Sequence, residues 1–154
     1  MKNEKSNCIN FCIALVILLI VIVALVVDNC FLKHTPESIL KANFSISLKN
    51  FDYSVETFEE QWSANGDGQA LAIYKFNELT RENINYLKGF ALHPLPISEK
   101  ERELMIFNEI PKEYFEVDTG YYIYEQLSTH DIRDYKVFII DTEKKNAVLY
   151  YQYM

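Results

Sequence analysis

Residues 9–27 read INFCIALVILLIVIVALVV, nineteen residues without a charged side chain. At about 1.5 Å per residue, a helix of this length spans roughly 28 Å, close to the ~30 Å hydrocarbon thickness of a bilayer. Fifteen of the nineteen residues are Ile, Leu, Val or Phe, and together they favour insertion by roughly 5 to 9 kcal/mol. The run therefore predicts a single transmembrane helix. The rest of the chain is interpreted as the part that this helix anchors to the membrane.

The charges beside the run predict its orientation. Lys2 and Lys5 precede it with only Glu4 against them, whereas Asp28 follows it directly. The positive-inside rule then keeps residues 1–8 in the cytoplasm as a short leader. No A-x-A-like cleavage site follows the run, which favours an uncleaved signal anchor. The expected location is the cell membrane, crossed once, with the C-terminal domain extracytoplasmic.

The remaining residues, 28–154, are enough for one compact domain with its own core. The whole chain has a net charge of −7, and residues 1–27 contribute two Lys and one Glu, so the outer part carries −8. This charge repels phosphate and makes nucleic-acid binding improbable. Apart from the bilayer around residues 9–27, a basic protein is the partner that suits the domain best. The oligomeric state stays open.

The cysteines exclude a disulfide within the outer domain. Cys8 and Cys12 lie at the start of the apolar run, and only Cys30 follows it. Cys30 is interpreted as an unpaired juxtamembrane thiol, with an intermolecular disulfide or a lipid attachment as alternatives. Because closely spaced Cys and His residues are absent, we expect neither a metal site nor any cofactor.

Residues 28–43 are interpreted as a juxtamembrane linker that contains one short helix. Thr35 is a helix-capping residue and Pro36 suits the first helical position, so a helix is predicted over residues 36–42. From Phe44 the apolar residues alternate up to Leu48, which predicts a strand and the start of a domain over residues 44–154.

A β-hairpin is predicted around the turn at residues 65–68. Alternation resumes over residues 51–62, although the spacing of its apolar residues also fits a helix face over residues 54–62. The dense turn signal that follows favours the strand, with residues 70–76 as the return arm. The turn consists of Asn65, Gly66, Asp67 and Gly68.

The rest of the chain alternates between helical and strand patterns. Helices are predicted over residues 79–89 and from Ser98 to Pro111, with a proline-rich loop over residues 93–96 between them. The predicted fold class is α+β, a mostly antiparallel sheet of about six strands with two or three helices on one face. Residues 135–141 are apolar on both sides and should be covered on both sides. The later strands are residues 121–126, 135–141 and 147–153.

Few residues suggest catalysis. His130, Asp131 and Asp134 have the composition of part of a metal hydrolase site, but the other histidines, His34 and His93, provide no matching ligand set. The three residues are therefore interpreted as a solvated turn whose aspartates bond local backbone donors. The chain contains no G-x-S-x-G nucleophile motif and no glycine loop for phosphate. A triad assembled in space stays open, and an enzyme is the less favoured interpretation.

Aromatic residues are the more informative candidates, because they supply large rigid contact areas. The candidates can either cover the sheet or form a docking surface. With the acidic charge, they favour a membrane-anchored extracytoplasmic binding module, such as an immunity or inhibitor protein that captures a basic protein. The alternatives are an envelope hydrolase and an assembly subunit of a membrane complex. The candidate binding residues are Trp62, Tyr121, Tyr122, Tyr124 and Tyr151.

Overall fold

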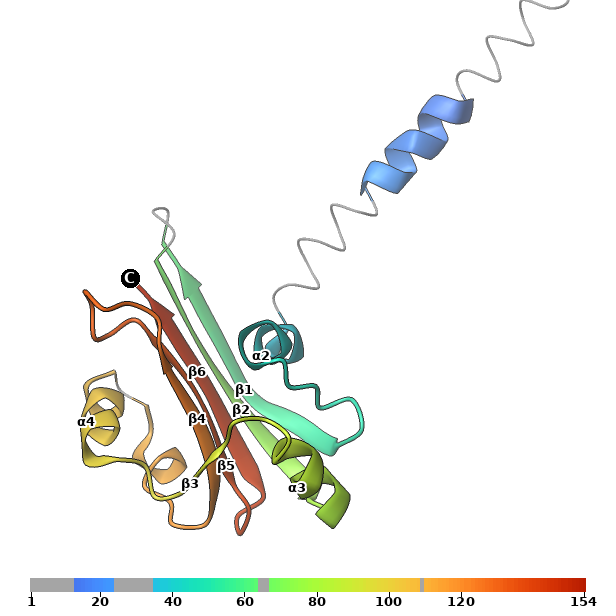
Figure 1. Cartoon of the computed structure of the whole chain (residues 1–154). Helices are drawn as coiled ribbons and strands as arrows, with labels where there is room; N and C mark the ends of the chain where they lie inside the picture. The colour runs from blue at the N-terminus through green and yellow to red at the C-terminus, as the bar shows by residue number, and fades with distance from the viewer. Residues whose placement is uncertain (1–12, 24–34, 64–66, 109) are drawn as a thin grey trace, which may run out of the picture. The chain divides into compact units, whose positions relative to one another are not determined.

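The computed structural model describes residues 13–23, 35–63, 67–108 and 110–154 (Figure 1). The chain divides into two units, Met1–Ile39 and Leu40–Met154. The second unit begins four residues before the predicted boundary at residue 44. Leu40 and Phe44, at the end of the predicted linker helix, are buried and belong to this second unit.

Within the first unit, residues 13–23 form a helix in which every residue is exposed. In the described part of the chain, no helix combines the length and the hydrophobicity needed to cross a bilayer. The other residues of the predicted span, 9–12 and 24–27, lie outside the described residues, as do Cys30 and His34.

Helix α2 (Pro36–Phe44) confirms the predicted linker helix. Its first turn is capped as expected, because the Thr35 hydroxyl accepts a hydrogen bond from the Ser38 backbone N–H at 3.2 Å. The two residues predicted to be buried, Ile39 and Leu40, are 5% and 0% exposed.

The second unit is built on a six-stranded sheet in the order β1-β2-β6-β5-β4-β3 (Figure 1). Each pair of neighbouring strands is antiparallel. The predicted α+β class with an antiparallel sheet is therefore confirmed. The strands are β1 (Asp52–Trp62), β2 (Gly68–Glu78), β3 (His93–Pro94), β4 (Gly120–Gln126), β5 (Tyr135–Asp141) and β6 (Asn146–Tyr153).

The predicted hairpin is formed by β1 and β2. Trp62 pairs with Gly68 in the register, and the Ser63 backbone N–H donates to the Asp67 carbonyl at 2.8 Å. A side chain at Gly68 would collide with the Trp62 indole, so glycine allows this ring to lie across β2. The first two predicted turn residues, Asn65 and Gly66, lie outside the described residues.

Two strand assignments from the sequence are wrong. Residues 44–48 alternate between buried and less buried as predicted, yet they form no strand. Ser45 has a φ of 59°, and the Ser47 N–H donates to the Tyr86 hydroxyl at 3.0 Å instead of to a neighbouring strand. Conversely, His93 and Pro94, predicted as loop, pair with Tyr122 and Tyr121 of β4 as a short edge strand.

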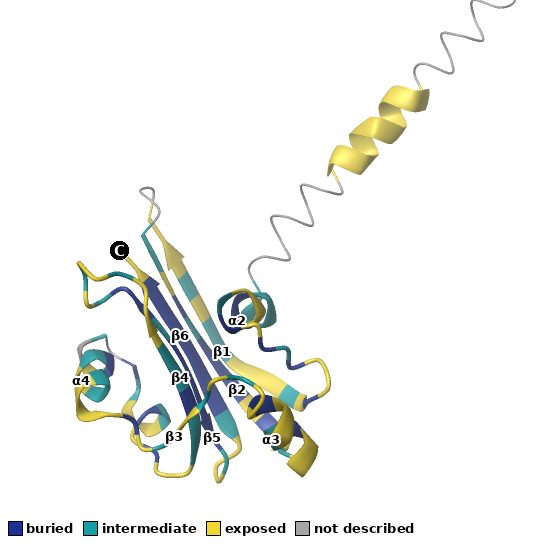
Figure 2. Ribbon diagram, in the orientation of Figure 1, coloured by how far each residue is buried: buried dark blue, intermediate teal, exposed yellow. Residues whose placement is uncertain are grey.

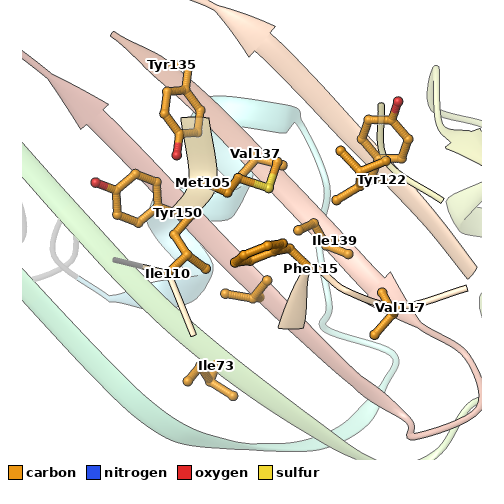
Figure 3. Close-up of a cluster of buried hydrophobic side chains, with 12 residues drawn as sticks. Ile73, Met105, Ile110, Phe115, Val117, Tyr122, Tyr135, Val137, Ile139 and Tyr150 are labelled. Carbon is orange, nitrogen blue, oxygen red and sulfur yellow. The ribbon is translucent and has the colours of Figure 1, made fainter. Parts of the chain in front are cut away.

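One face of the sheet, here the α4 face, is covered by helix α4 (Glu99–Phe107), the 3₁₀ helix η2 (Lys112–Tyr114) and the segments around them. Met105 and Phe115 are fully buried there and belong to one core cluster with side chains from β2, β4, β5 and β6 (Figure 3). The sheet residues of this cluster are Ile73, Tyr122, Tyr135, Val137, Ile139, Val148 and Tyr150.

The opposite face, here the α3 face, is also covered, so the prediction that helices lie on one face is wrong (Figure 1). Phe44 at the end of α2 packs on Phe138 of β5, with ring centres 6.1 Å apart. Phe51 lies between Phe76 of β2 and Tyr86 of helix α3 (Arg81–Leu87), at 5.8 and 5.9 Å. The Phe44 contact and the core cluster on the α4 face together give β5 the cover on both sides that its apolar sequence predicts.

Gly120 at the start of β4 provides a test of the backbone geometry. Its φ is +133°, and an added Cβ would collide with the Ile140 carbonyl of β5. We expect Gly120→Ala to lower the free energy of unfolding by about 2 to 4 kcal/mol. Gly89→Ala, at a glycine without positive φ, should cost clearly less. Urea unfolding of the full chain in detergent measures both, and equal losses would contradict the assigned strain.

Candidate functional site

The sheet separates the five candidate aromatic residues onto two faces. Tyr122 and Tyr124 of β4 pair with Ile139 and Val137, which places them on the α4 face. Tyr122 is buried, and Tyr124 stacks on Tyr135 with ring centres 5.3 Å apart. These two tyrosines pack in or against the core cluster, so they do not join the other candidates in one binding surface.

Trp62 and Tyr151 do meet, on the α3 face, with ring centres 6.0 Å apart. Tyr151 is buried and donates a hydrogen bond from its hydroxyl to Glu60 Oε1 at 3.4 Å. Burial raises the pKa of Tyr151, and the neighbouring Glu60 carboxylate raises it further. Trp62 is 52% exposed, so it presents an indole to solvent above a buried tyrosine.

Tyr153 completes what we call the aromatic end, defined as Glu60, Trp62, Tyr151 and Tyr153. Trp62 and Tyr153 both pair with Gly68 in the register. The two aromatic residues therefore flank a position without a side chain, and Tyr153 is 55% exposed. The remaining candidate, Tyr121, lies away from this end on β4, where the Lys88 ammonium is 5.5 Å from its ring centre.

Strand β1 forms one edge of the sheet and leads to the aromatic end. None of its 11 residues is buried, which distinguishes it from the central strands (Figure 2). The strand contains no basic residue, and one of its carboxylates, Glu56, pairs with Lys75 at 3.1 Å. Its acidic residues are Asp52, Glu56, Glu59 and Glu60.

The other edge of the sheet is protected at one end. Strand β3 has two residues, His93 and Pro94, which pair with Tyr122 and Tyr121 of β4, and proline has no backbone N–H to offer an incoming strand. An edge strand as long as β1 exposes backbone donors and acceptors that can pair with another chain. Strand β1 is therefore a long edge suited to pairing, and it is acidic.

A repeated polar pair on the α4 face was not among the candidates predicted from the sequence. Tyr124 donates to Gln126 Oε1 at 2.8 Å, and Tyr150 donates to Gln152 Oε1 at 2.9 Å. Both pairs follow the pattern Tyr-x-Gln, and residues two apart in a strand share a face. The Tyr-x-Gln spacing at residues 124–126 and 150–152 could have predicted from the sequence that these polar side chains lie on the same face of the sheet.

The segment around His130 is a turn, as predicted. Arg133 forms hydrogen bonds to Asp131 through its side chain and its backbone N–H, and these bonds lower the pKa of Asp131 to about 2. Asp134 differs from the prediction because it is buried, where it accepts a bond from the Met154 N–H at 2.7 Å. Among the described residues, no group of three or more His, Cys, Asp or Glu could hold a metal.

The aromatic end and β1 together offer exposed ring surface, carboxylates and backbone hydrogen-bonding groups. Such a set suits noncovalent binding of a cationic, extended segment, because aromatic faces and carboxylates both attract positive charge. Comparison with protein-family models, curated proteins and solved structures finds no match to this chain.

The buried tyrosines predict a loss of stability at alkaline pH. Burial raises the pKa of Tyr150 to about 12 and also raises those of Tyr135 and Tyr151. In the unfolded chain, tyrosine hydroxyls ionise near pH 10. The contribution of the buried tyrosines to the free energy of unfolding is therefore complete below about pH 10, and it is lost as the pH rises through the pKa values of the folded state. Urea unfolding and absorbance at 295 nm should show phenolate forming as the fold is lost.

In the same experiment, Tyr151→Phe should be less stable than the parent at pH 7, because it lacks the bond to Glu60. Above pH 10 its stability should fall less steeply, since one buried ionisable hydroxyl is gone. An alkaline slope identical to that of the parent would contradict this assignment.

Proposed function

We propose that this chain is a membrane-anchored extracytoplasmic binding module that captures a basic protein, in the manner of an immunity or inhibitor protein. The observation that supports this most is the open edge strand β1, which carries four carboxylates and no basic residue and ends at the exposed Trp62.

Strand addition is the binding mode that this edge supports. An extended partner segment would pair its backbone with β1, which supplies affinity that does not depend on sequence. Glu59 and Glu60 at the end of the strand would attract basic side chains and increase the association rate. Trp62 would supply the aromatic anchor, since tryptophan often dominates binding energy at protein interfaces.

The charge of β1 favours a basic partner over a second copy of the chain. Two copies paired through β1 would bring eight carboxylates, four from each strand, along one junction. Like charges opposite each other destabilise strand pairing, and charged edges protect sheets from self-association. A segment rich in Lys or Arg removes this repulsion.

The sequence of residues 9–27 supports the membrane anchor. Residues 13–23 are helical, and their apolar side chains are exposed around the whole helix. A helix that is apolar on every side requires apolar surroundings, either a protein core or lipid. The charges that flank the run support the orientation with the N-terminus in the cytoplasm.

A basic probe peptide tests capture directly, because Trp62 is the only tryptophan of the chain. A peptide that alternates Lys with Thr and matches the 11 residues of β1 should change the Trp62 fluorescence in a saturable manner. Binding should weaken as salt rises from low to physiological levels, since exposed charges are then screened. A peptide that alternates Glu with Thr should leave the fluorescence unchanged.

Variants identify the surface, with a labelled peptide and anisotropy as the readout. We expect Trp62→Ala to weaken binding about tenfold and Glu59→Gln with Glu60→Gln about fivefold. Glu99→Gln, a loss of charge at the exposed start of α4, is the control and should change affinity less than about twofold, as expected for a distant rim charge. Equal weakening by the control would leave only nonspecific charge attraction and contradict capture at β1.

The anchor and its orientation have a separate test. A tag at the C-terminus of the full chain should be digested by protease added to intact cells, and the tagged chain should remain with the membrane fraction. Protection of the tag in intact cells and digestion only after lysis would contradict the orientation. Release of the tagged chain into the medium would contradict the anchor.

A further inference from the structure

The α4 face contains a cavity that is separate from the aromatic end. Its volume is about 200 Å³. The cavity opens over β1, β2 and β6, on the face opposite Trp62, and its wall on the other side comes from the segment after α4. The lining combines amide, hydroxyl and aliphatic groups from Gln61, Gln69, Asn108, Tyr150, Leu71 and Ile110.

Two polar groups of this cavity are held in place by short neighbouring bonds. The Tyr150 hydroxyl donates to Gln152 at 2.9 Å, and the Asn108 amide nitrogen donates to the Leu104 carbonyl at 2.8 Å. Gln69 donates to Gln61 across the hairpin at 3.4 Å. A hydroxyl or a primary amide can form more than one hydrogen bond, so these groups have capacity for a ligand, and the bonds to Gln152 and to the Leu104 carbonyl position Tyr150 and Asn108 for it.

Tyr135 lies behind this lining with a buried hydroxyl that makes no well-formed hydrogen bond within the described part of the chain. The Asn108 side chain of the lining lies near enough to this hydroxyl to oppose the rise of its pKa on burial. Its ring is 5.6 Å from that of Tyr150 between centres, and in Figure 3 its hydroxyl is directed toward the side of the cluster where Tyr150 and Met105 lie. Buried hydroxyls without a partner are rare in folded proteins. A ligand in the cavity lined by Tyr150 would bring further hydrogen-bonding groups close to the Tyr135 hydroxyl.

The chemistry of the lining defines the class of ligand. Among the described residues, no Lys or Arg lines the cavity, so nothing there attracts an anion, and Glu59 is the one carboxylate of the lining. The cavity is smaller than the roughly 300 to 1,000 Å³ typical of sites for larger ligands and cofactors. Amides and a phenol beside Leu71 and Ile110 suit an uncharged ring that carries hydroxyls on its edge and has an apolar face. We propose that this cavity binds an uncharged monosaccharide.

Titration with N-acetylglucosamine and with glucose tests this proposal. The full chain, in a detergent without a sugar head group, is followed by NMR of the Gln and Asn side-chain amides. At least one of the two sugars should shift these signals in a saturable manner, with a Kd in the millimolar range, as expected for a small ring held by a few hydrogen bonds. The absence of a saturable shift with either sugar at about 50 mM, well above a Kd of about 1 mM, would overturn the proposal.

Two variants and one control assign the binding to this cavity. Tyr150→Phe, which removes only a hydroxyl, and Gln61→Leu, at an exposed position, should each weaken binding about fivefold. Tyr124→Phe removes the hydroxyl of the equivalent Tyr-x-Gln pair outside the cavity and should change the Kd less than about twofold, within the effect of a distant site. Equal weakening by Tyr124→Phe, or unchanged binding in both cavity variants, would overturn the assignment.

Discussion

The structure depends on burial of apolar side chains on both faces of its central strands. In β5, Val137 and Ile139 face the α4 cluster, while Phe138 and Ile140 face the other way, and all four are at most 1% exposed. Burying a side chain of this size contributes roughly 1.5 to 3 kcal/mol. A sheet with this centre needs a covering layer on each face, so the segments before β1 and between β2 and β4 are used as cover.

This constraint places the candidate binding groups at the periphery. The covering layers leave β1 without a buried residue, and its carboxylates and Trp62 lie where hydration is retained. Carboxylates are costly to bury without partners, whereas at an edge strand they also discourage pairing with similar chains. The proposed site thus lies at the edge because the centre of the sheet is fully used for stability.

Local patterns predicted the elements well and their long-range contacts poorly. Alternation and turn residues identified β1, β2, β4, β5 and β6, because these signals lie within a few residues of each other. The strand predicted over residues 44–48 failed because Ser47 bonds to Tyr86, 39 residues away. Likewise, Tyr151 was a candidate for an exposed site, but it is buried beside Glu60, 91 residues away, a contact that no local spacing encodes.

The alternation of side chains in β1 allows one strand to serve two surfaces. Glu60 and Trp62 pair with Ala70 and Gly68 on the α3 face, whereas Glu59 and Gln61 pair with Leu71 and Gln69 beside the cavity. Adjacent residues of one strand therefore contact different environments. Because the backbone is shared, a partner strand that rigidifies β1 would also fix one wall of the cavity, and a ligand in the cavity would favour the same ordered edge. The two proposed sites are thus chemically separable but are joined through one strand.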